Sequence, residues 1–478
     1  MIKRIISLTM CAIVLLSAIV ISGCTKKPAN EPSGDTETVA VDTGDTYVAP
    51  DVNYNGMDFN IMRWTWDEDW VLSISDESSA IEKQSYYHLM TVERELNLKF
   101  KIALEQRGEY GHHGAFVSKV LTLTGQDNID LICQYSLAAS IGAQQGLYAN
   151  LLELEHINWD GYYWSDSLYE YNAVNGKMYY CTGDLTGTSI KNMFVMLYNY
   201  DMANNHQMGN LYDLVDEGKW TVEKLKELSK NVYMDENNNN MRDVGDTFGL
   251  VVGDYRTIDA LQAGANLVSI IKDKNNKLVI NEQMSGAYGT DVVNKLEDML
   301  HNNTGAYCNT KENEEYGDAL QEGKAVFTIS MCENIINTIS KSDINYGILP
   351  IPKYSEDQEN YHTCLNMTYN MYSVPSIARN PNMSGAVLES LSHSGNKNLI
   401  PVIYEALQYK YSQRTDDVRM LEILRKGIIY DPGRTFDQMG IYSFVRSTVR
   451  DNVSPASSWE GRSPQYYGNI DAVNKIFE

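Results

Sequence analysis

The first part of the folded chain alternates between strand and helix patterns. Three segments predict strands, the third of them mostly apolar: Asp58–Trp64, Leu98–Leu104 and Ile129–Tyr135. Two segments between them predict helices, the second closed by Gly125: Ala80–Asn97 and Phe116–Thr124. This order predicts an α/β fold with a parallel, doubly wound sheet. In such a sheet the loops that face a ligand follow the carboxyl ends of the strands.

The same kind of alternation continues to the C-terminus. Further strands or extended segments are expected at Phe194–Tyr200, Ala325–Met331, Tyr346–Pro350 and Thr368–Val374. Further helices are expected at 222–232, 256–269, 286–301 and 313–322, followed by an almost wholly helical tail. Thr221 is a plausible N-cap, with Trp220 packing on Leu225 as a hydrophobic staple. The roughly 425 residues from Val52 onward are too many for one compact core and suit two lobes.

The N-terminus has the pattern of a secretory signal. Lys3 and Arg4 precede the apolar run Ile5–Ile21, and small residues stand before Cys24. The alternative is a transmembrane anchor, for which the run is barely long enough. Residues 25–51 are rich in Thr, Asp, Gly, Pro and Ala without apolar periodicity, which predicts a flexible linker. The folded part is therefore expected to begin near Val52.

Charge and aromatic content limit the classes of partner. The formal net charge is -24, and removing Lys3 and Arg4 with the signal makes it -24 - 2 = -26. Nucleic acid and anionic lipid are therefore poor partners for the body of the protein. The acidity also argues weakly against an anionic ligand, although a local pocket can override it. The excess of 33 Tyr and 7 Trp over 9 Phe favours polar surfaces on which a ligand stacks.

The cysteines indicate neither a disulfide framework nor a metal pair. Two of the seven, Cys11 and Cys24, lie in the signal. The other five are widely spaced and odd in number, at positions 133, 181, 308, 332 and 364. Buried free thiols are therefore expected.

Short motifs carry a resemblance to a known family. Residues 21–24 resemble the bacterial lipobox, in which the cysteine, here Cys24, is lipid-modified and becomes the new N-terminus. Downstream, six segments match family motifs in the expected order: Thr124–Leu131, Gly146–Leu151, Leu197–Asp201, Gly218–Thr221, Glu322–Phe327 and Tyr346–Lys353. In this order the chain resembles the bacterial extracellular solute-binding proteins of ABC importers, of the large sugar-binding type typified by maltose-binding protein.

That resemblance implies a fold and a function. It implies two α/β lobes, each a mainly parallel sheet flanked by helices, that close around a ligand by hinge motion. By analogy lobe 1 holds residues 52–160 and 348–400, and lobe 2 holds 165–345 and 401–478. The implied protein is a monomeric, non-enzymatic receptor, lipid-anchored through Cys24 on the extracellular face of the membrane. It requires no cofactor and delivers a carbohydrate, in preference an oligosaccharide, to an ABC permease.

Candidate ligand contacts follow from the strand ends and from exposed aromatic residues. Sugar sites need aromatic platforms together with carboxylates and amides. Each candidate also has an ordinary structural interpretation, in the core, at a helix cap or on a solvated surface. The candidates are Trp64, Trp66, Tyr135, Ser136, Glu333, Asn334, Trp459 and Glu460, the last two placed in a loop of the helical tail.

One segment has the spacing of a calcium loop. Oxygen ligands recur through residues 235–246, and Met241 would contribute its carbonyl. The side-chain ligands would be Asp235, Asn237, Asn239, Asp243 and Asp246. Asn240 replaces the usual glycine and Asp246 the usual glutamate, so weak affinity is expected. A polar, metal-free loop is an equal alternative.

Two rival functions stay open at this point. A secreted glycoside hydrolase needs a pair of carboxylates, and 63 acidic residues always allow some pair to be nominated. No nucleophile elbow, HExxH or GxGxxG-with-acid constellation marks one out. A surface adhesin or scaffold would predict repeats or β-sandwich spacing, which the chain lacks. A peptide or polyamine ligand also remains open.

Overall fold

The computed structural model describes residues 47–65, 67–109, 111–310, 316, 318–408, 415–436 and 440–478. The predicted signal and Cys24 lie outside the described residues, as does Trp66. The compact unit begins at Tyr47, five residues before the expected Val52. Tyr47 stacks on His393 with ring centroids 3.7 Å apart, so the end of the expected linker is part of the folded body. Within the described segments, no helix is long and apolar enough to cross a membrane.

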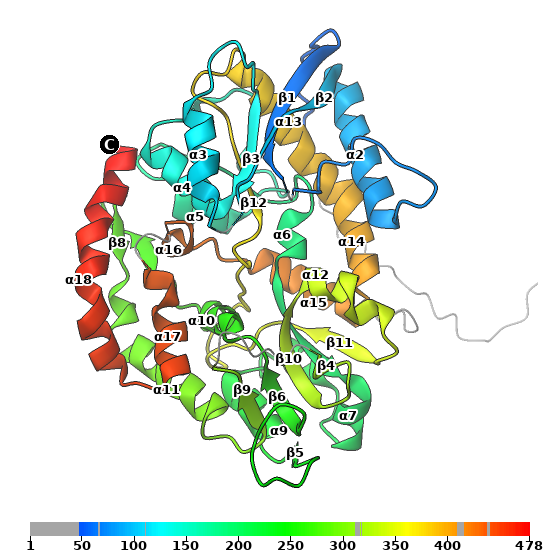
Figure 1. The fold of residues 1–478 in the computed structure, drawn as a ribbon, viewed down its shortest axis with the longest axis vertical. Coiled ribbons are helices and arrows are strands. Elements are labelled where there is room, and N and C mark those ends of the chain that lie inside the picture. The colour runs from blue at the N-terminus through cyan, green and yellow to red at the C-terminus, as the bar shows by residue number, and fades with distance from the viewer. Residues whose placement is uncertain are drawn as a thin grey trace, which may run out of the picture. The chain divides into compact units, whose positions relative to one another are not determined.

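The first sheet has the order β12-β3-β1-β2 (Figure 1). Its strands are β1 Met57–Trp64, β2 Leu98–Gln106, β3 Leu131–Tyr135 and β12 Asn370–Ser373. β1 is parallel to β2 and to β3, as the alternation of strand and helix predicts, and β12 is antiparallel to β3. All five residues of β3 are buried, which explains its mostly apolar sequence. The carboxyl ends of β1 and β3 therefore meet at one edge of the sheet.

The second sheet has the order β11-β4-β10-β6-β5, with β9 also paired to β6. Its strands are β4 Phe194–Asn199, β5 Tyr233–Met234, β6 Thr247–Val252, β9 Ala306–Cys308, β10 Ala325–Met331 and β11 Tyr346–Leu349. β6 is parallel to β9 and β10, but β4 is antiparallel to both β10 and β11, and β5 is antiparallel to β6. The sheet is thus mixed, where the family resemblance implies a mainly parallel one. A separate hairpin pairs β7 Ile270–Lys272 with β8 Leu278–Ile280.

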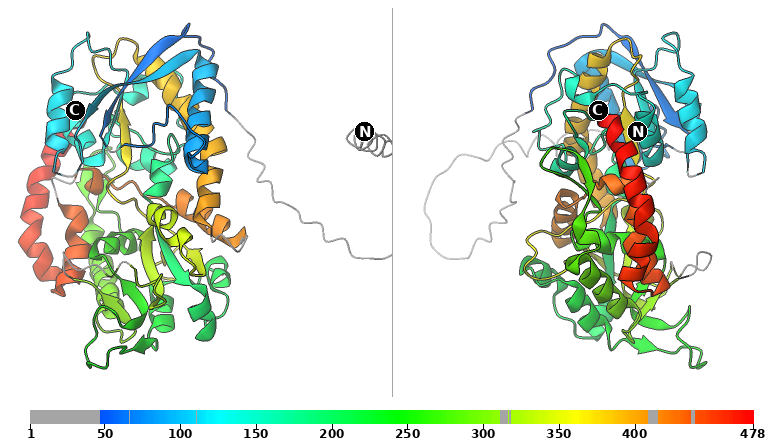
Figure 2. Two further views of the ribbon diagram at one scale, coloured as in Figure 1. Left: turned by 45° about the vertical axis from the view of Figure 1, so that its right-hand side comes forward. Right: turned by 90° about the vertical axis from the view of Figure 1, so that its left-hand side faces the viewer.

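Helices cover both sheets. From the N-terminal side they are α2 Ala80–Leu96, α3 His113–Leu121, α4 Ser136–Gln144, α5 Asp166–Asn172, α6 Thr188–Lys191, α7 Tyr200–Asn205, α8 Leu211–Asp216, α9 Val222–Ser229, α10 Ile258–Gly264 and α11 Ala287–Leu300. The later ones are α12 Cys332–Asn337, α13 Pro381–Ser394, α14 Ile400–Leu407, α15 Thr415–Lys426, α16 Pro432–Thr435, α17 Phe444–Asp451 and α18 Pro455–Asn474. A π-helical turn, η6 Gly395–Leu399, joins α13 to α14, and a short 3-10 turn, η9 Lys475–Phe477, follows α18. In Figure 2, α18 runs along one side of the molecule, and η9 contacts α4.

Caps explain where several helices begin. Ser79 Oγ accepts from Glu82 N at 3.2 Å while Glu82 Oε2 accepts from Ser79 N at 2.6 Å, so a capping box starts α2. Thr221 Oγ1 accepts from Lys224 N at 3.2 Å, which confirms it as the N-cap of α9. Trp220 is fully buried, and its Nε1 donates to Pro350 O at 2.8 Å.

Some predicted helix limits are wrong. The helix expected to run to Thr124 ends at Leu121, because Thr122 closes it three residues before Gly125. The helix expected at 256–269 consists of a 3-10 turn at Tyr255–Thr257 and α10. The described part of the expected helix 313–322, residues 316 and 318–322, is not helical.

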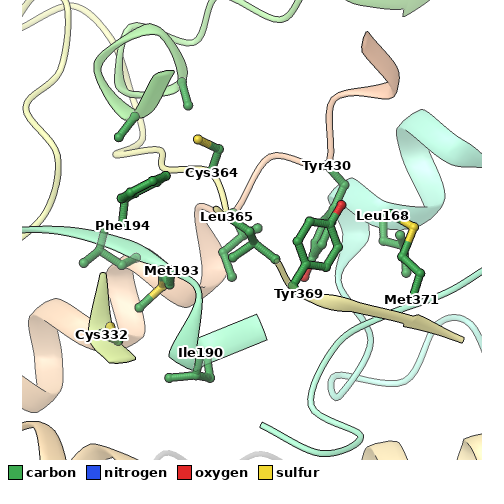
Figure 3. Packing of buried hydrophobic residues seen from close by; sticks show 14 of the residues in the cluster. Leu168, Ile190, Met193, Phe194, Cys332, Cys364, Leu365, Tyr369, Met371 and Tyr430 are labelled. Carbon is green, nitrogen blue, oxygen red and sulfur yellow. The ribbon is translucent and has the colours of Figure 1, made fainter. Parts of the chain in front are cut away.

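The chain passes more than once between the regions of the two sheets. It leaves the first sheet after β3, builds the second through β11, and returns to the first at β12. The expected boundary near residues 345–348 falls inside β11, which pairs with β4. Buried apolar side chains pack around the crossing segments, among them Met193, Phe194 and Leu365 (Figure 3).

Candidate functional site

The predicted contacts at the ends of β1 and β3 are buried and already bonded. Trp64 is 7% exposed; its Nε1 donates to Asn370 Oδ1 at 2.6 Å, and its ring meets the edge of Tyr135 at 5.9 Å. Ser136 Oγ donates to Met367 O at 2.9 Å. The structure thus brings Trp64, Tyr135 and Ser136 together, under the chain that leads into β12.

A charged cluster beyond β1 was not among the predicted contacts. Asp69 Oδ1 accepts from Lys191 Nζ of α6 at 2.5 Å. Asp67 is 2% exposed, and its Oδ2 has no hydrogen bond within the described residues. Burial, reinforced by the charge of Asp69, raises the pKa of Asp67 to about 7. Burial of Lys191 acts to lower its pKa, but the ion pair with Asp69 outweighs burial and the pKa is raised. The signal that marks Asp67 and Asp69 is their position directly after the first strand.

Glu333 and Asn334 begin α12, directly after β10. Glu333 is half-buried, and its pKa is raised by burial and by the charges of Asp69 and Glu68, against the pull of Lys191. The helix that carries Glu333, α12, contacts α6, which carries Lys191. Asn334 is exposed, and its Nδ2 donates to Ser330 Oγ at 3.4 Å. Side chains that follow strands of both sheets thus meet in the region of α6 and α12, which neighbour each other in Figure 1.

Asn334 also lines a cavity of about 280 Å³. The cavity opens at the carboxyl ends of the parallel strands β6 and β10. Asp254 and Thr257, from the turn after β6, and Ser330 of β10 line it. Asn366, from the chain that crosses back to the first sheet, closes it, and Phe194 contributes an aromatic wall. Amides, hydroxyls and the ion pair of Asp254 with Arg256 around an aromatic face form a lining able to bind a polar, uncharged molecule.

A cluster of Arg434, Arg446 and Tyr442, here called the arginine wall, was also not predicted from the sequence. Arg434 and Arg446 each bond Asp259 Oδ2 at 2.9 Å, and Asp259 is 4% exposed. Both guanidinium groups lie over the ring of Tyr442, at 5.5 and 5.2 Å. No sequence signal predicts this wall, because α10, α16 and α17 bring its residues together only in the fold.

Trp459 and Glu460 lie in a helix, so their predicted placement in a loop is wrong. Pro455 occupies the first turn of α18, where it removes no needed donor, and the helix continues through Pro464. Trp459 is half-buried, with its ring 5.1 Å from Phe444 and 5.6 Å from Tyr466. Glu460 is exposed on the same helix. Tertiary packing along one helix face outweighs the Ser, Pro and Gly of this segment.

Hydrogen bonds among its own residues hold the Asn-rich loop, residues 235–246, which has the spacing of a calcium loop. Asp235 Oδ2 accepts from Asn240 N at 2.8 Å, and Asn239 Oδ1 accepts from Met241 N at 2.7 Å. Asp246 is fully buried, and Asp243 Oδ2 accepts from Asn239 Nδ2 at 2.7 Å. Asn237 Oδ1 accepts from Asn239 N at 2.9 Å. Across the part of the chain that the structure describes, no group of three His, Cys, Asp or Glu side chains is placed to hold a metal. Calcium binding here stays a prediction that rests on sequence spacing.

The five cysteines of the folded body are free thiols, as expected. Four are buried and Cys308 is half-buried. Burial raises the pKa of every one of these thiols, so none is a reactive thiolate near neutral pH.

Comparisons with solved structures identify the fold. Maltose-binding protein MalE from Listeria monocytogenes, in complex with maltose, has a TM-score of 0.54 and 14% identity over 87% of this chain and 98% of its own. An ABC substrate-binding protein of the same organism, Lmo0181, in complex with cycloalternan, has a TM-score of 0.53 and 12% identity over 88% and 98%. UgpB from Mycobacterium tuberculosis, in complex with glycerophosphocholine, has a TM-score of 0.51 and 12% identity over 87% and 98%. The chain therefore has the two-lobe fold of these binding proteins.

Searches by sequence found no relative of the chain. No family model matches the chain, and no curated protein matches it.

Proposed function

We propose that this protein is the extracellular substrate-binding component of an ABC importer and that it captures a carbohydrate between its lobes. The observation that carries the proposal is the convergence of polar side chains from the strand ends of both sheets. Asp69 follows β1 and pairs with Lys191 of α6, and Glu333 follows β10 on α12, which contacts α6. The fold shared with maltose- and cycloalternan-bound proteins supports a sugar as ligand.

The mechanism we propose is population shift. A ligand that touches groups on both lobes binds the closed state better than the open one, so binding favours closure. The amides and hydroxyls of the cavity next to β6 and β10 suit sugar hydroxyls. The closed form would then deliver the sugar to the permease.

We also propose that the body is monomeric and that a lipid anchors the protein through Cys24, which lies outside the described residues. The proposal of a lipid anchor rests on the lipobox-like segment at residues 21–24. Wild type expressed in a bacterium is expected to incorporate a labelled fatty acid, and a Cys24→Ala variant is expected not to. Absence of label from wild type, or equal labelling of the variant, would contradict lipidation at Cys24.

A thermal-shift and calorimetric screen tests the proposed function. The purified body is incubated with maltose, maltotriose, cycloalternan, glycerophosphocholine, short peptides and polyamines. A carbohydrate is expected to raise the melting temperature and bind with one-to-one stoichiometry, and it should be recovered unchanged. Hydrolysed sugar would favour the glycoside hydrolase instead, and binding by peptide or polyamine alone would exclude a sugar receptor.

A further inference from the structure

A second cavity, of about 300 Å³, lies between residues 162–166, 183–189 and 425–430. It shares no lining residue with the cavity at the ends of β6 and β10. Figure 3 shows Phe194, which lines the first cavity, and Tyr430, which lines the second, on either side of the buried Leu365. The second cavity is therefore a separate space, and nothing in the proposed function uses it.

Two buried side chains present unused polar atoms to this second cavity. Asp184 is 4% exposed, and its Oδ2 accepts from Arg425 Nη1 at 3.0 Å and Asn396 Nδ2 at 2.8 Å. Its Oδ1 accepts no hydrogen bond from the residues described, and the hydroxyl of Tyr430, itself 4% exposed, has no partner among them either. Neither atom is sealed off inside the protein, so both reach the cavity. Buried polar groups normally have hydrogen-bond partners, so these two atoms indicate that a bonding partner is absent from the cavity.

The charge around the cavity favours a neutral ligand. Arg425 is held against Asp184 at 3.0 Å and compensates its carboxylate. A cationic ligand would have to displace that guanidinium, whereas a hydroxyl can donate to Oδ1 without disturbing the pair. Gly395 packs against this point so closely that a Cβ would stand 1.8 Å from Asp184 O, which fixes the backbone of Asp184 in place.

Aromatic side chains also line the second cavity. Tyr162 is half-buried and lines the cavity, together with Trp164. The Trp164 ring is held by its Nε1, which donates to Glu389 Oε2 at 3.0 Å, and Tyr163 donates to the same carboxylate. A cavity lined by aromatic rings together with a carboxylate and a hydroxyl combines an apolar face with hydroxyl-binding groups.

We propose that this cavity is a second binding site, for one neutral, polyhydroxylated ring of monosaccharide size. Its hydroxyls donate to Asp184 Oδ1 and bond the Tyr430 hydroxyl, and its C–H face lies against Tyr162. The volume is at the lower end of the range for small-molecule pockets, which excludes a longer chain. The site involves none of the residues assigned to the first cavity.

The probe for this site is D-glucose, titrated to ~50 mM against the full body and followed by ligand-observed NMR. Tyr430→Phe removes only the hydroxyl and is expected to weaken glucose binding about fivefold. Ser165→Phe places a ring in the cavity and is expected to abolish that binding. The matched control is Tyr467→Phe, on a tyrosine 56% exposed on α18, which should bind as wild type does.

Each other outcome overturns the proposal. No saturable glucose binding by wild type does so directly. Wild-type affinity in Tyr430→Phe, with circular dichroism showing an intact fold, also does so. Loss of glucose binding in Asn334→Ala, with binding kept in Tyr430→Phe, would place the sugar in the first cavity. That last result would support the proposed function while rejecting the second site.

Discussion

The strand ends of the two sheets obey the same topological rule but present different surfaces. At the ends of β1 and β3, Trp64 and Ser136 are buried, and their polar atoms donate hydrogen bonds to Asn370 and Met367. After β6 and β10, Asp254 and Asn334 line a cavity of about 280 Å³. The difference teaches that a position at a carboxyl strand end is not enough to make a ligand contact. The side chain must also keep a polar atom that its own neighbours do not use.

The largest effect is expected from Trp64, at the buried strand ends of the first sheet. Trp64→Ala should lower the free energy of unfolding by about 3–5 kcal/mol, because it leaves a cavity and strips Asn370 of its donor. Trp64→Phe should cost less, since it keeps most of the buried ring. Urea denaturation measures both. Unchanged stability together with lost sugar binding would mean that Trp64 faces the ligand.

Trp459 extends the comparison to α18. The sequence-based interpretation makes it a ligand contact, whereas its packing on Phe444 and Tyr466 predicts a structural role. Trp459→Ala is expected to cost about 2 kcal/mol of unfolding free energy and leave sugar affinity unchanged. Calorimetry of folding and of binding on the same sample separates the two roles. A binding defect at full stability would reinstate the ligand contact.

Asn334 tests the strand ends of the second sheet, whose side chains line a cavity. Asn334→Ala should weaken binding of the sugar identified by the screen about fivefold, because one amide hydrogen bond is lost. Its melting temperature should not move, since the side chain is exposed. Asn337→Ala, an exposed asparagine on the same helix, is the matched control and should bind normally. Equal affinities of the two variants would remove Asn334 from the site.

Asp67 sharpens the comparison through pH. Its pKa is raised to about 7 in the folded protein by burial and by Asp69, against an unfolded value of 3.8. The folded state therefore holds the proton more tightly, so the stabilisation by this group is fully present below pH 3.8. It is lost as the pH rises from there to about 7.

Asp67→Asn cannot ionise, so its melting temperature should fall less than that of wild type between pH 5 and 7. Asp58→Asn, on an exposed carboxylate, is the control and should follow wild type. Parallel curves for all three proteins would show that Asp67 does not titrate in this range.

The smallest effect is expected at the Asn-rich loop, which directly precedes β6. If the spacing of residues 235–246 holds calcium weakly, millimolar calcium should raise the melting temperature by about 2 °C, reversibly with a chelator. Asp243→Asn should remove the effect, and magnesium should not reproduce it. An unchanged melting temperature would favour the metal-free loop.

Local patterns were enough to predict most elements. β10 has the expected bounds and α2 nearly so, because alternation, apolar run length and a capping box act over a few residues. The failures occurred where distant packing competes with local signals. α18 continues through Pro464 because Tyr466 and Val473 are buried along one face, and the antiparallel pairing of β4 with β10 leaves no trace in either strand.

The sequence by itself determined the α/β class, the strands whose ends carry polar groups, and the free thiols, since all of these depend on neighbouring residues and composition. Only the tertiary structure decided which polar atoms remain unused. Trp64 Nε1 is bonded to Asn370, far along the chain, whereas Asp184 and Tyr430 come from distant segments to line one cavity. A hydrogen bond between distant residues depends on positions in space to within a few tenths of an ångström. Periodicity along the chain holds no such information.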